Sequence, residues 1–156
     1  HLVRYEDDQL PSVDWVLEVA KAAVYRYGIR GLVIDPYNEL DHQRPASMSE
    51  TEYVSQMLTK VQKFIKTHDL HCWFVAHPAK MNRSGNDQPR PDGMAISGSM
   101  AWWAKTDCGI TVHRGEGMVV EIAVWKCRYR WVGTQGETTL LYNKVSGAYS
   151  EQLDHF

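Results

Sequence analysis

Residues 31–36 read Gly-Leu-Val-Ile-Asp-Pro, and residues 71–78 read His-Cys-Trp-Phe-Val-Ala-His-Pro. Each stretch is a short apolar run that a proline ends, which predicts a strand buried on both faces, as in a parallel sheet. Between the two runs, Ser49 and Glu52 have the spacing of a capping box. They precede an apolar stripe at helical spacing, made of Val54, Met57, Leu58, Val61 and Ile65. Strand, helix and strand at this spacing predict a βαβ unit with parallel strands and a right-handed crossover.

The sequence on either side of this unit predicts further elements. Ser12 is a suitable N-cap for a helix that ends near Tyr27, where Gly28 can adopt the left-handed conformation. Residues 80–96 are polar and rich in proline and glycine, which predicts a long loop. The rest of the chain predicts a short helix at 98–105 and strands at 108–113, 119–125 and 138–142. The expected class is therefore α/β, with a parallel sheet, helices and C-terminal antiparallel strands.

The composition indicates one domain with a substantial core, because 44% of the 156 residues are hydrophobic. Seventeen basic and nineteen acidic residues give a net charge of −2, so a nucleic-acid partner requires a local basic patch. No apolar run approaches the roughly 20 residues needed to cross a bilayer, and no signal peptide is recognisable, so no membrane partner is expected. The three cysteines form no CxxC pair, which suits a reducing compartment, and we expect a cytoplasmic location.

Asp35 and His77 each follow a predicted parallel strand, at the edge where open α/β sheets bind ligands. A carboxylate at this edge suits Mg²⁺ beside substrate phosphates. A histidine on the neighbouring strand can contact the terminal phosphate. The simpler interpretation is that Asp35 caps a turn and His77 merely ends a strand. Their separation by one βαβ unit favours the functional interpretation.

Residues 125–130 read Trp-Lys-Cys-Arg-Tyr-Arg. Strand alternation predicts that Lys126, Arg128 and Arg130 project from one face. An ammonium and a guanidinium held side by side suit phosphate oxygens. The alternative interpretation is an edge strand that its charges protect from pairing with another chain.

Four stretches together resemble the RecA-like helicase domain of the DnaB family, in particular its phage primase-helicase and Twinkle-type members. LVIDPYNEL (32–40) is similar to the Walker B strand, and CWFVAHPAK (72–80) is similar to the strand that ends at the polar sensor. ISGSMAWWAKTD (96–107) is similar to the short helix and aspartate after the DNA-facing loop. WKCRYRWVGTQGETTLLYNKVSGAY (125–149) is similar to the segment that carries the arginine finger. The resemblance covers about residues 13–149 and implies a fragment of a RecA-like P-loop NTPase core.

The resemblance also implies roles for four residues in binding and hydrolysing ATP or another NTP. Asp35 would serve the Mg²⁺ ion and His77 would sense the phosphate. Arg128 would be an arginine finger that reaches the nucleotide of the adjacent subunit, assisted by Lys126. We therefore expect the Arg128 guanidinium to protrude, unpaired with any carboxylate of its own chain. Lys126 should point the same way and Cys127 the opposite way.

Residues 80–97 would be the loop that lines a channel for single-stranded DNA in a homo-hexameric ring. Lys80, Arg83 and Ser97 are the candidate DNA contacts, and Arg90 adds a further basic side chain. Phage members carry arginines where this chain has Ser97 and Trp103, so Lys80 and Arg83 are expected to substitute for them. At least one of the paired tryptophans Trp102 and Trp103 is expected to pack in the core.

The sequence contains no G-x-x-x-x-G-K-[ST] motif, and only 34 residues precede Asp35. We therefore expect residues 1–156 to be the C-terminal portion of a RecA-like helicase domain without its P-loop part, and to be inactive alone. Two other hypotheses stay open. The chain could be a degenerate RecA-like module that only oligomerises or binds DNA. The second hypothesis is a metal-dependent hydrolase, although no metal-ligand spacing in the sequence supports it. Its metal ligands would be Asp35, His42, His68, His71 and His77.

Overall fold

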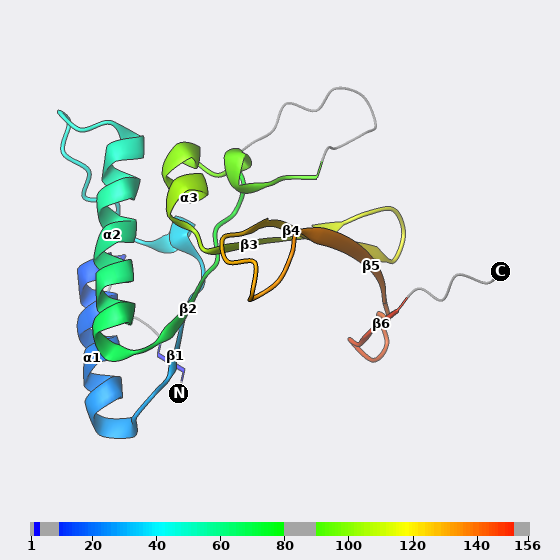
Figure 1. Cartoon of the computed structure of the whole chain (residues 1–156), viewed down its shortest axis with the longest axis horizontal. Coiled ribbons are helices and arrows are strands. Elements are labelled where there is room, and N and C mark those ends of the chain that lie inside the picture. Colours follow the sequence, from blue (N-terminus) through cyan, green and yellow to red (C-terminus); the bar gives the residue numbers. More distant parts are fainter. Residues whose placement is uncertain (1, 4–9, 80–89, 152–156) are drawn as a thin grey trace.

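The computed structural model describes residues 2–3, 10–79 and 90–151, and its elements alternate as the sequence predicts (Figure 1). The first part contains α1 (Val13–Tyr27), β1 (Gly31–Ile34), the 3-10 helix η1 (Tyr37–Glu39), α2 (Glu50–His68) and β2 (His71–Phe74). The second part contains the 3-10 helix η2 (Gly93–Ala95), α3 (Ser99–Lys105), β3 (Cys108–Arg114), β4 (Val119–Cys127), β5 (Gly136–Tyr142) and β6 (Tyr149–Glu151). The α/β class is confirmed.

The first two long helices begin and end at the residues that the sequence indicates. The Ser12 side chain accepts a hydrogen bond from the Trp15 amide at 3.2 Å, and Gly28 ends α1 with φ +62°. At the start of α2, Ser49 and Glu52 form the complete capping box. These caps satisfy backbone groups that each helix end would otherwise leave without partners.

Strands β1 and β2 pair in parallel, from Gly31 opposite His71 to Ile34 opposite Phe74. One face of the pair packs against the helices. Ile34 and Val54 are 4% and 0% exposed in this core, which Trp102 of α3 joins. On the opposite face, Val33 and Trp73 are 64% and 53% exposed. The prediction that these strands are buried on both faces is therefore wrong for the described part of the chain.

Strands β3 to β6 form a separate antiparallel sheet in the order β3-β4-β5-β6, which extends away from the helices (Figure 1). The β3–β4 register shifts between Gly109 and Ile110, which pair with Lys126 and Val124 and leave Trp125 as an extra residue. This β-bulge turns the indole across the backbone of Gly109. A β-carbon at Gly109 would lie 2.2 Å from the Trp125 ring, so only glycine fits there.

Two predictions about the strands need correction. Strand β4 ends at Cys127, so Arg128 and Arg130 lie in the turn beyond it and not on a strand face. Strand β6 was not expected. It pairs with β5 across a tight connection, in which Asn143 accepts hydrogen bonds from the amides of Val145 and Ser146 and Gly147 has φ +70°.

In the described part of the chain, no helix is both long enough and apolar enough to cross a bilayer.

Candidate functional site

Asp35 and His77 lie at the same edge of the parallel pair, just beyond the carboxyl ends of β1 and β2. The pairing continues past the strands, since the Val75 amide donates to the Ile34 carbonyl at 2.9 Å. Both Asp35 and His77 are exposed. The fold therefore brings the two residues to one solvent-facing edge, as the βαβ pattern predicts.

Asn38 joins the two strand ends at this edge. Its side-chain oxygen accepts a hydrogen bond from the His77 amide at 2.8 Å. Tyr37, one residue earlier, donates its own amide to the Val75 carbonyl at 2.7 Å. The Tyr37 ring is 4% exposed and lies edge-on to the Trp102 ring, and burial is the main cause that raises the pKa of its hydroxyl to about 12. A buried aromatic anchor and an amide bridge thus fix the backbone that carries Asp35 and His77.

The Asp35 carboxylate forms no hydrogen bond or ion pair with any described residue. Mg²⁺ binds through one or two carboxylates, with waters and substrate phosphates completing an octahedral shell. A single free carboxylate at an open edge suits such an ion better than a metal held only by protein side chains. Among the described residues, no three acidic, histidine or cysteine side chains gather around a metal position. The metal-dependent hydrolase hypothesis therefore gains no support.

Lys126 and Arg128 converge on the carboxyl end of α3. The Lys126 ammonium donates to the Trp103 carbonyl, and Arg128 Nη2 donates to the Ala104 carbonyl at 2.6 Å. Helix C-terminal carbonyls lack partners within their helix and favour cations, which explains why both side chains lie there. Lys126 and Arg128 thus point the same way, as expected. Burial lowers the pKa of Lys126, and the neighbouring Arg128 charge lowers it further.

Arg128 has a carboxylate partner in its own chain. Its Nε lies 2.9 Å from Asp107 Oδ1, and its amide donates to the Asp107 carbonyl at 2.8 Å. The expectation that the guanidinium is unpaired is therefore wrong. Antiparallel pairing of β3 with β4 places Asp107 directly opposite Arg128, an arrangement that the sequence of either strand alone does not reveal. Cys127 points elsewhere, with its thiol against the Tyr129 carbonyl at 3.4 Å.

The structure does not connect the two groups of site residues directly. No hydrogen bond or ion pair in the described part of the chain links Lys126 or Arg128 to Asp35 or His77. Sequence reasoning missed Asn38 and Asp107 as residues that hold the site backbone and the arginine. Both residues lie inside the stretches that resemble the family. The sequence therefore showed where they lie in the chain, but not which groups they contact in the fold.

The candidate DNA-contact residues are only partly described. Lys80 and Arg83 lie outside the described residues. The Ser97 hydroxyl donates to the Glu50 carboxylate, which ties it to the first turn of α2. Trp102 is 3% exposed and confirms that one of the paired tryptophans packs in the core, whereas Trp103 is 36% exposed and stacks on Trp125.

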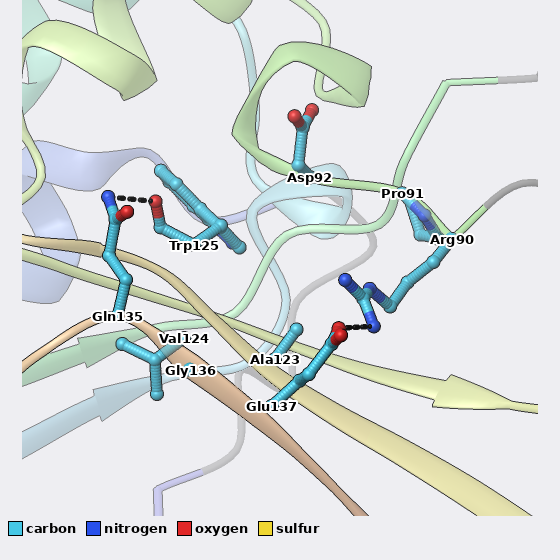
Figure 2. A pocket seen from close by; sticks show the side chains of 9 residues that line it. All are labelled: Arg90, Pro91, Asp92, Ala123, Val124, Trp125, Gln135, Gly136 and Glu137. Atoms are coloured by element: carbon cyan, nitrogen blue, oxygen red, sulfur yellow. Dashed lines mark hydrogen bonds and ion pairs between the residues drawn. The ribbon is translucent and has the colours of Figure 1, made fainter.

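A cavity of about 420 Å³ lies between residues 90–92, which precede η2, and the β4–β5 part of the sheet (Figure 2). Arg90 lines one side of it, and its guanidinium lies 2.5 Å from the Glu137 carboxylate and 3.8 Å from that of Glu121. On the other side, the Gln135 side chain donates to the Trp125 carbonyl at 2.8 Å, which satisfies a backbone group beside the bulge. The Arg90 charge is thus offset by two carboxylates, so Arg90 is a poor candidate for binding phosphates.

Comparison with known proteins supports the family resemblance. No protein-family model matches the chain. Over 155 residues the chain is 52% identical to the Twinkle homolog protein, chloroplastic/mitochondrial, of Arabidopsis thaliana. The match covers 96% of this chain but 22% of that relative, so the chain spans less than a quarter of the relative's length.

Two solved structures are similar in fold. One is an ATPase domain with a TM-score of 0.70 at 18% identity, a match that covers 91% of this chain and 52% of that one. The other is a DnaB-like replicative helicase, whose structure was described with its interactions with primase, with a TM-score of 0.70 at 18% identity. That match covers 91% of this chain and 36% of the helicase chain. The RecA-like fold of a DnaB-type ATPase domain and the Twinkle-type resemblance are therefore confirmed. The relative's name specifies chloroplasts and mitochondria, so the cytoplasmic location stays a prediction.

Proposed function

We propose that this chain is part of a Twinkle-type replicative DNA helicase that couples NTP hydrolysis to translocation along single-stranded DNA. Residues 1–156 would supply the portion of the RecA-like domain that follows the P-loop part. Similarity to the Twinkle homolog supports this proposal. The observation that carries it is the placement of a free Asp35 carboxylate and an exposed His77 at one ligand-binding edge of a RecA-like sheet.

In this proposal, ATP or another NTP binds together with Mg²⁺, and the ion would neutralise part of the negative charge of the phosphates. Asp35 holds the ion at the edge of the sheet, and His77 detects the terminal phosphate. The amide bridge from Asn38 keeps the His77 backbone in register with the end of β1. Phosphoryl transfer depends mainly on positioning and charge stabilisation, which suits residues fixed on strand ends.

Arg128 and Lys126 would act on the nucleotide of a neighbouring subunit in a homo-hexameric ring. Among the described residues, no hydrogen bond or ion pair joins either side chain to Asp35, as expected of side chains that act on a neighbouring subunit. To reach a neighbour, the Arg128 guanidinium must exchange its contacts with Asp107 and the α3 carbonyls for phosphate oxygens. These contacts are exposed, so the exchange costs little. Lys80, Arg83 and Ser97 would face single-stranded DNA in the central channel.

The isolated chain should not hydrolyse nucleotides, because its sequence contains no loop that cradles the phosphates. A chimera tests the function directly. The segment of the Arabidopsis relative that matches this chain is replaced by residues 1–156, and DNA-stimulated ATP hydrolysis is measured against the unmodified relative. We expect hydrolysis in the chimera and its loss in the chimera with Asp35→Ala.

A degenerate RecA-like module is the competing function. The pairing of Arg128 with Asp107 favours it, because a carboxylate of the same chain occupies the candidate finger. A chimera that assembles into rings and binds DNA, yet hydrolyses no nucleotide, would support this module and overturn the helicase proposal.

A further inference from the structure

Cys108 and Cys127 face each other across the ends of two strands. Cys108 is the first residue of β3, Cys127 is the last residue of β4, and the antiparallel register pairs them directly. Directly opposed residues of an antiparallel pair project from the same side of the sheet. Both cysteines carry free thiols. The third cysteine, Cys72, lies in β2 of the other sheet.

The backbone hydrogen bonds identify the type of this pair. The Arg128 amide donates to the Asp107 carbonyl at 2.8 Å, and successive amides on a strand point in opposite directions. The Cys127 amide therefore points away from β3, and Cys108 and Cys127 form a non-hydrogen-bonded pair. The α-carbons of such a pair are about 4.5 Å apart, within the range of roughly 4.4–6.8 Å that disulfides span.

We propose that Cys108 and Cys127 are a reversible dithiol–disulfide site, oxidised by a low-molecular-weight disulfide such as oxidised glutathione. One cysteine thiolate attacks the glutathione disulfide, which forms a mixed disulfide and releases one glutathione thiolate. The other cysteine thiolate attacks the protein sulfur of that mixed disulfide and releases the second glutathione. The protein loses two thiol hydrogens, and one oxidised glutathione becomes two reduced ones.

The surroundings make this pair the reactive one of the three thiols. Cys108 is exposed and Cys127 is half-buried, so a small disulfide can reach them. Burial raises the pKa of the Cys72 thiol to about 11, which keeps that cysteine protonated and unreactive. Burial, and after it the neighbouring Cys127, also raise the pKa of Cys108, so exposure to solvent and not thiol acidity distinguishes this pair from Cys72.

A bond at this site would join the residues that adjoin Asp107 and Arg128. Cys108 follows Asp107 and Cys127 precedes Arg128, so the bond would fix the strand ends that hold the ion pair. The proposal does not depend on the helicase function, because its readout is the state of the thiols and not hydrolysis.

The test equilibrates the whole purified chain in a glutathione redox buffer, stops thiol exchange with acid, and then alkylates the remaining thiols in denaturant at neutral pH. Intact and peptide mass spectrometry should show the loss of two hydrogens, a Cys108–Cys127 linkage within one chain, and an alkylated Cys72. The Cys72→Ala variant should behave the same way. Cys108→Ser and Cys127→Ser should instead carry glutathione on the remaining member of the pair.

The same equilibration in denaturant shows whether the folded structure favours the disulfide or whether the two cysteines would form it equally well in the unfolded chain. Closing the loop costs entropy in the unfolded chain, so the oxidation constant should fall by on the order of tenfold or more. An equal constant with and without denaturant would show that the fold does not position the pair. Mixed disulfides alone, linkages between chains, or three free thiols in the oxidised buffer would each overturn the proposal.

Discussion

Arg128 is held twice by Asp107: its Nε lies 2.9 Å from the Asp107 carboxylate, and its amide donates to the Asp107 carbonyl at 2.8 Å. One residue thus fixes both the backbone and the side chain of the candidate arginine finger. The two side chains are 39% and 50% exposed, so water screens their attraction. The pair orients the guanidinium without holding it strongly.

Replacing Asp107 with asparagine should therefore cost little stability. We expect Asp107→Asn to lower the free energy of unfolding by at most about 1 kcal/mol, the range of exposed ion pairs. The difference from wild type should shrink as salt is added, because ions screen exposed charges. Urea unfolding at low and high salt measures both effects. Asp69→Asn, which removes the exposed pair with Arg30, is the matched control. A salt-independent loss of several kcal/mol would show that the Asp107 contact is structural.

The helices were predictable because their signals are local. The N-cap residue, the apolar stripe and the left-handed C-terminal residue of a helix all lie within or next to that helix. Examples are Ser49, which caps α2, and Gly28, which ends α1. The exposed face of β1 and β2 was not predictable. An apolar run shows that both faces of a strand can be buried, but it does not show whether another element packs against each face. Strand β6 has only three residues and no apolar alternation, although Asn143 and Gly147 mark its turn.

Gly109→Ala should destabilise the antiparallel sheet. The added β-carbon would lie 2.2 Å from the Trp125 ring, which is also confined by Gly93 and stacks on Trp103. The indole must move, and we expect a loss of roughly 1–3 kcal/mol or more in the free energy of unfolding. Thermal and urea unfolding measure it.

Gly136→Ala is the matched control for this change. Gly136 also lies in a strand, but a β-carbon there would meet no atom within 4 Å and its backbone φ is not positive. Its substitution should leave stability nearly unchanged. Equal losses for the two variants would show that the contact with Trp125 does not explain the requirement for glycine at 109.

Ser49→Ala should destabilise α2 by about 1 kcal/mol, the usual cost of removing a serine N-cap. The substitution removes the acceptor for the Glu52 amide and one partner of the Glu52 carboxylate. Urea unfolding measures the loss, and Thr51→Ala in the same first turn is the control. A loss no larger than that of the control would mean that the capping box contributes nothing.

The capping box also predicts a dependence of stability on pH. Hydrogen bonds from the Ser49 hydroxyl and amide lower the pKa of Glu52 below its ordinary value of 4.5. The contribution of Glu52 is therefore complete above about that pH and is lost as the pH falls through the lowered pKa. Unfolding curves from neutral to acidic pH should show this loss in wild type and a weaker one in Glu52→Gln. Identical pH profiles would contradict it.

The candidate site was predictable where it depends on topology and not where it depends on contacts between strands. Parallel strands joined by one helix must end at the same edge, so Asp35 and His77 could be placed together from their spacing. The partner of Arg128 depends on the β3–β4 register, which the bulge at Trp125 shifts by one residue. No local pattern marks that shift.

If Arg128 is a finger for the neighbouring subunit, its removal should affect turnover and not nucleotide binding. In the chimera with the Arabidopsis relative, Arg128→Ala should lower the hydrolysis rate by a factor on the order of 10³ or more. Nucleotide affinity, measured separately, should stay nearly unchanged. Arg130→Ala is the matched control, because Arg130 is exposed and forms no hydrogen bond or ion pair with any described residue. Similar losses for both variants would argue for a general charge effect.

Mixing two inactive chimeras tests whether Arg128 acts across the interface. A ring that contains both Arg128→Ala and Asp35→Ala subunits has some interfaces where the first supplies an intact Asp35 and the second supplies an intact Arg128. Such a composite site is complete only if the arginine acts on the neighbour's nucleotide, so some hydrolysis should return on mixing. Light scattering and subunit exchange with labelled chains establish that mixed rings form. If mixed rings form and no mixture regains activity, Arg128 does not act across the interface, and Lys126 to Arg130 are better explained as a charged edge that holds the end of α3.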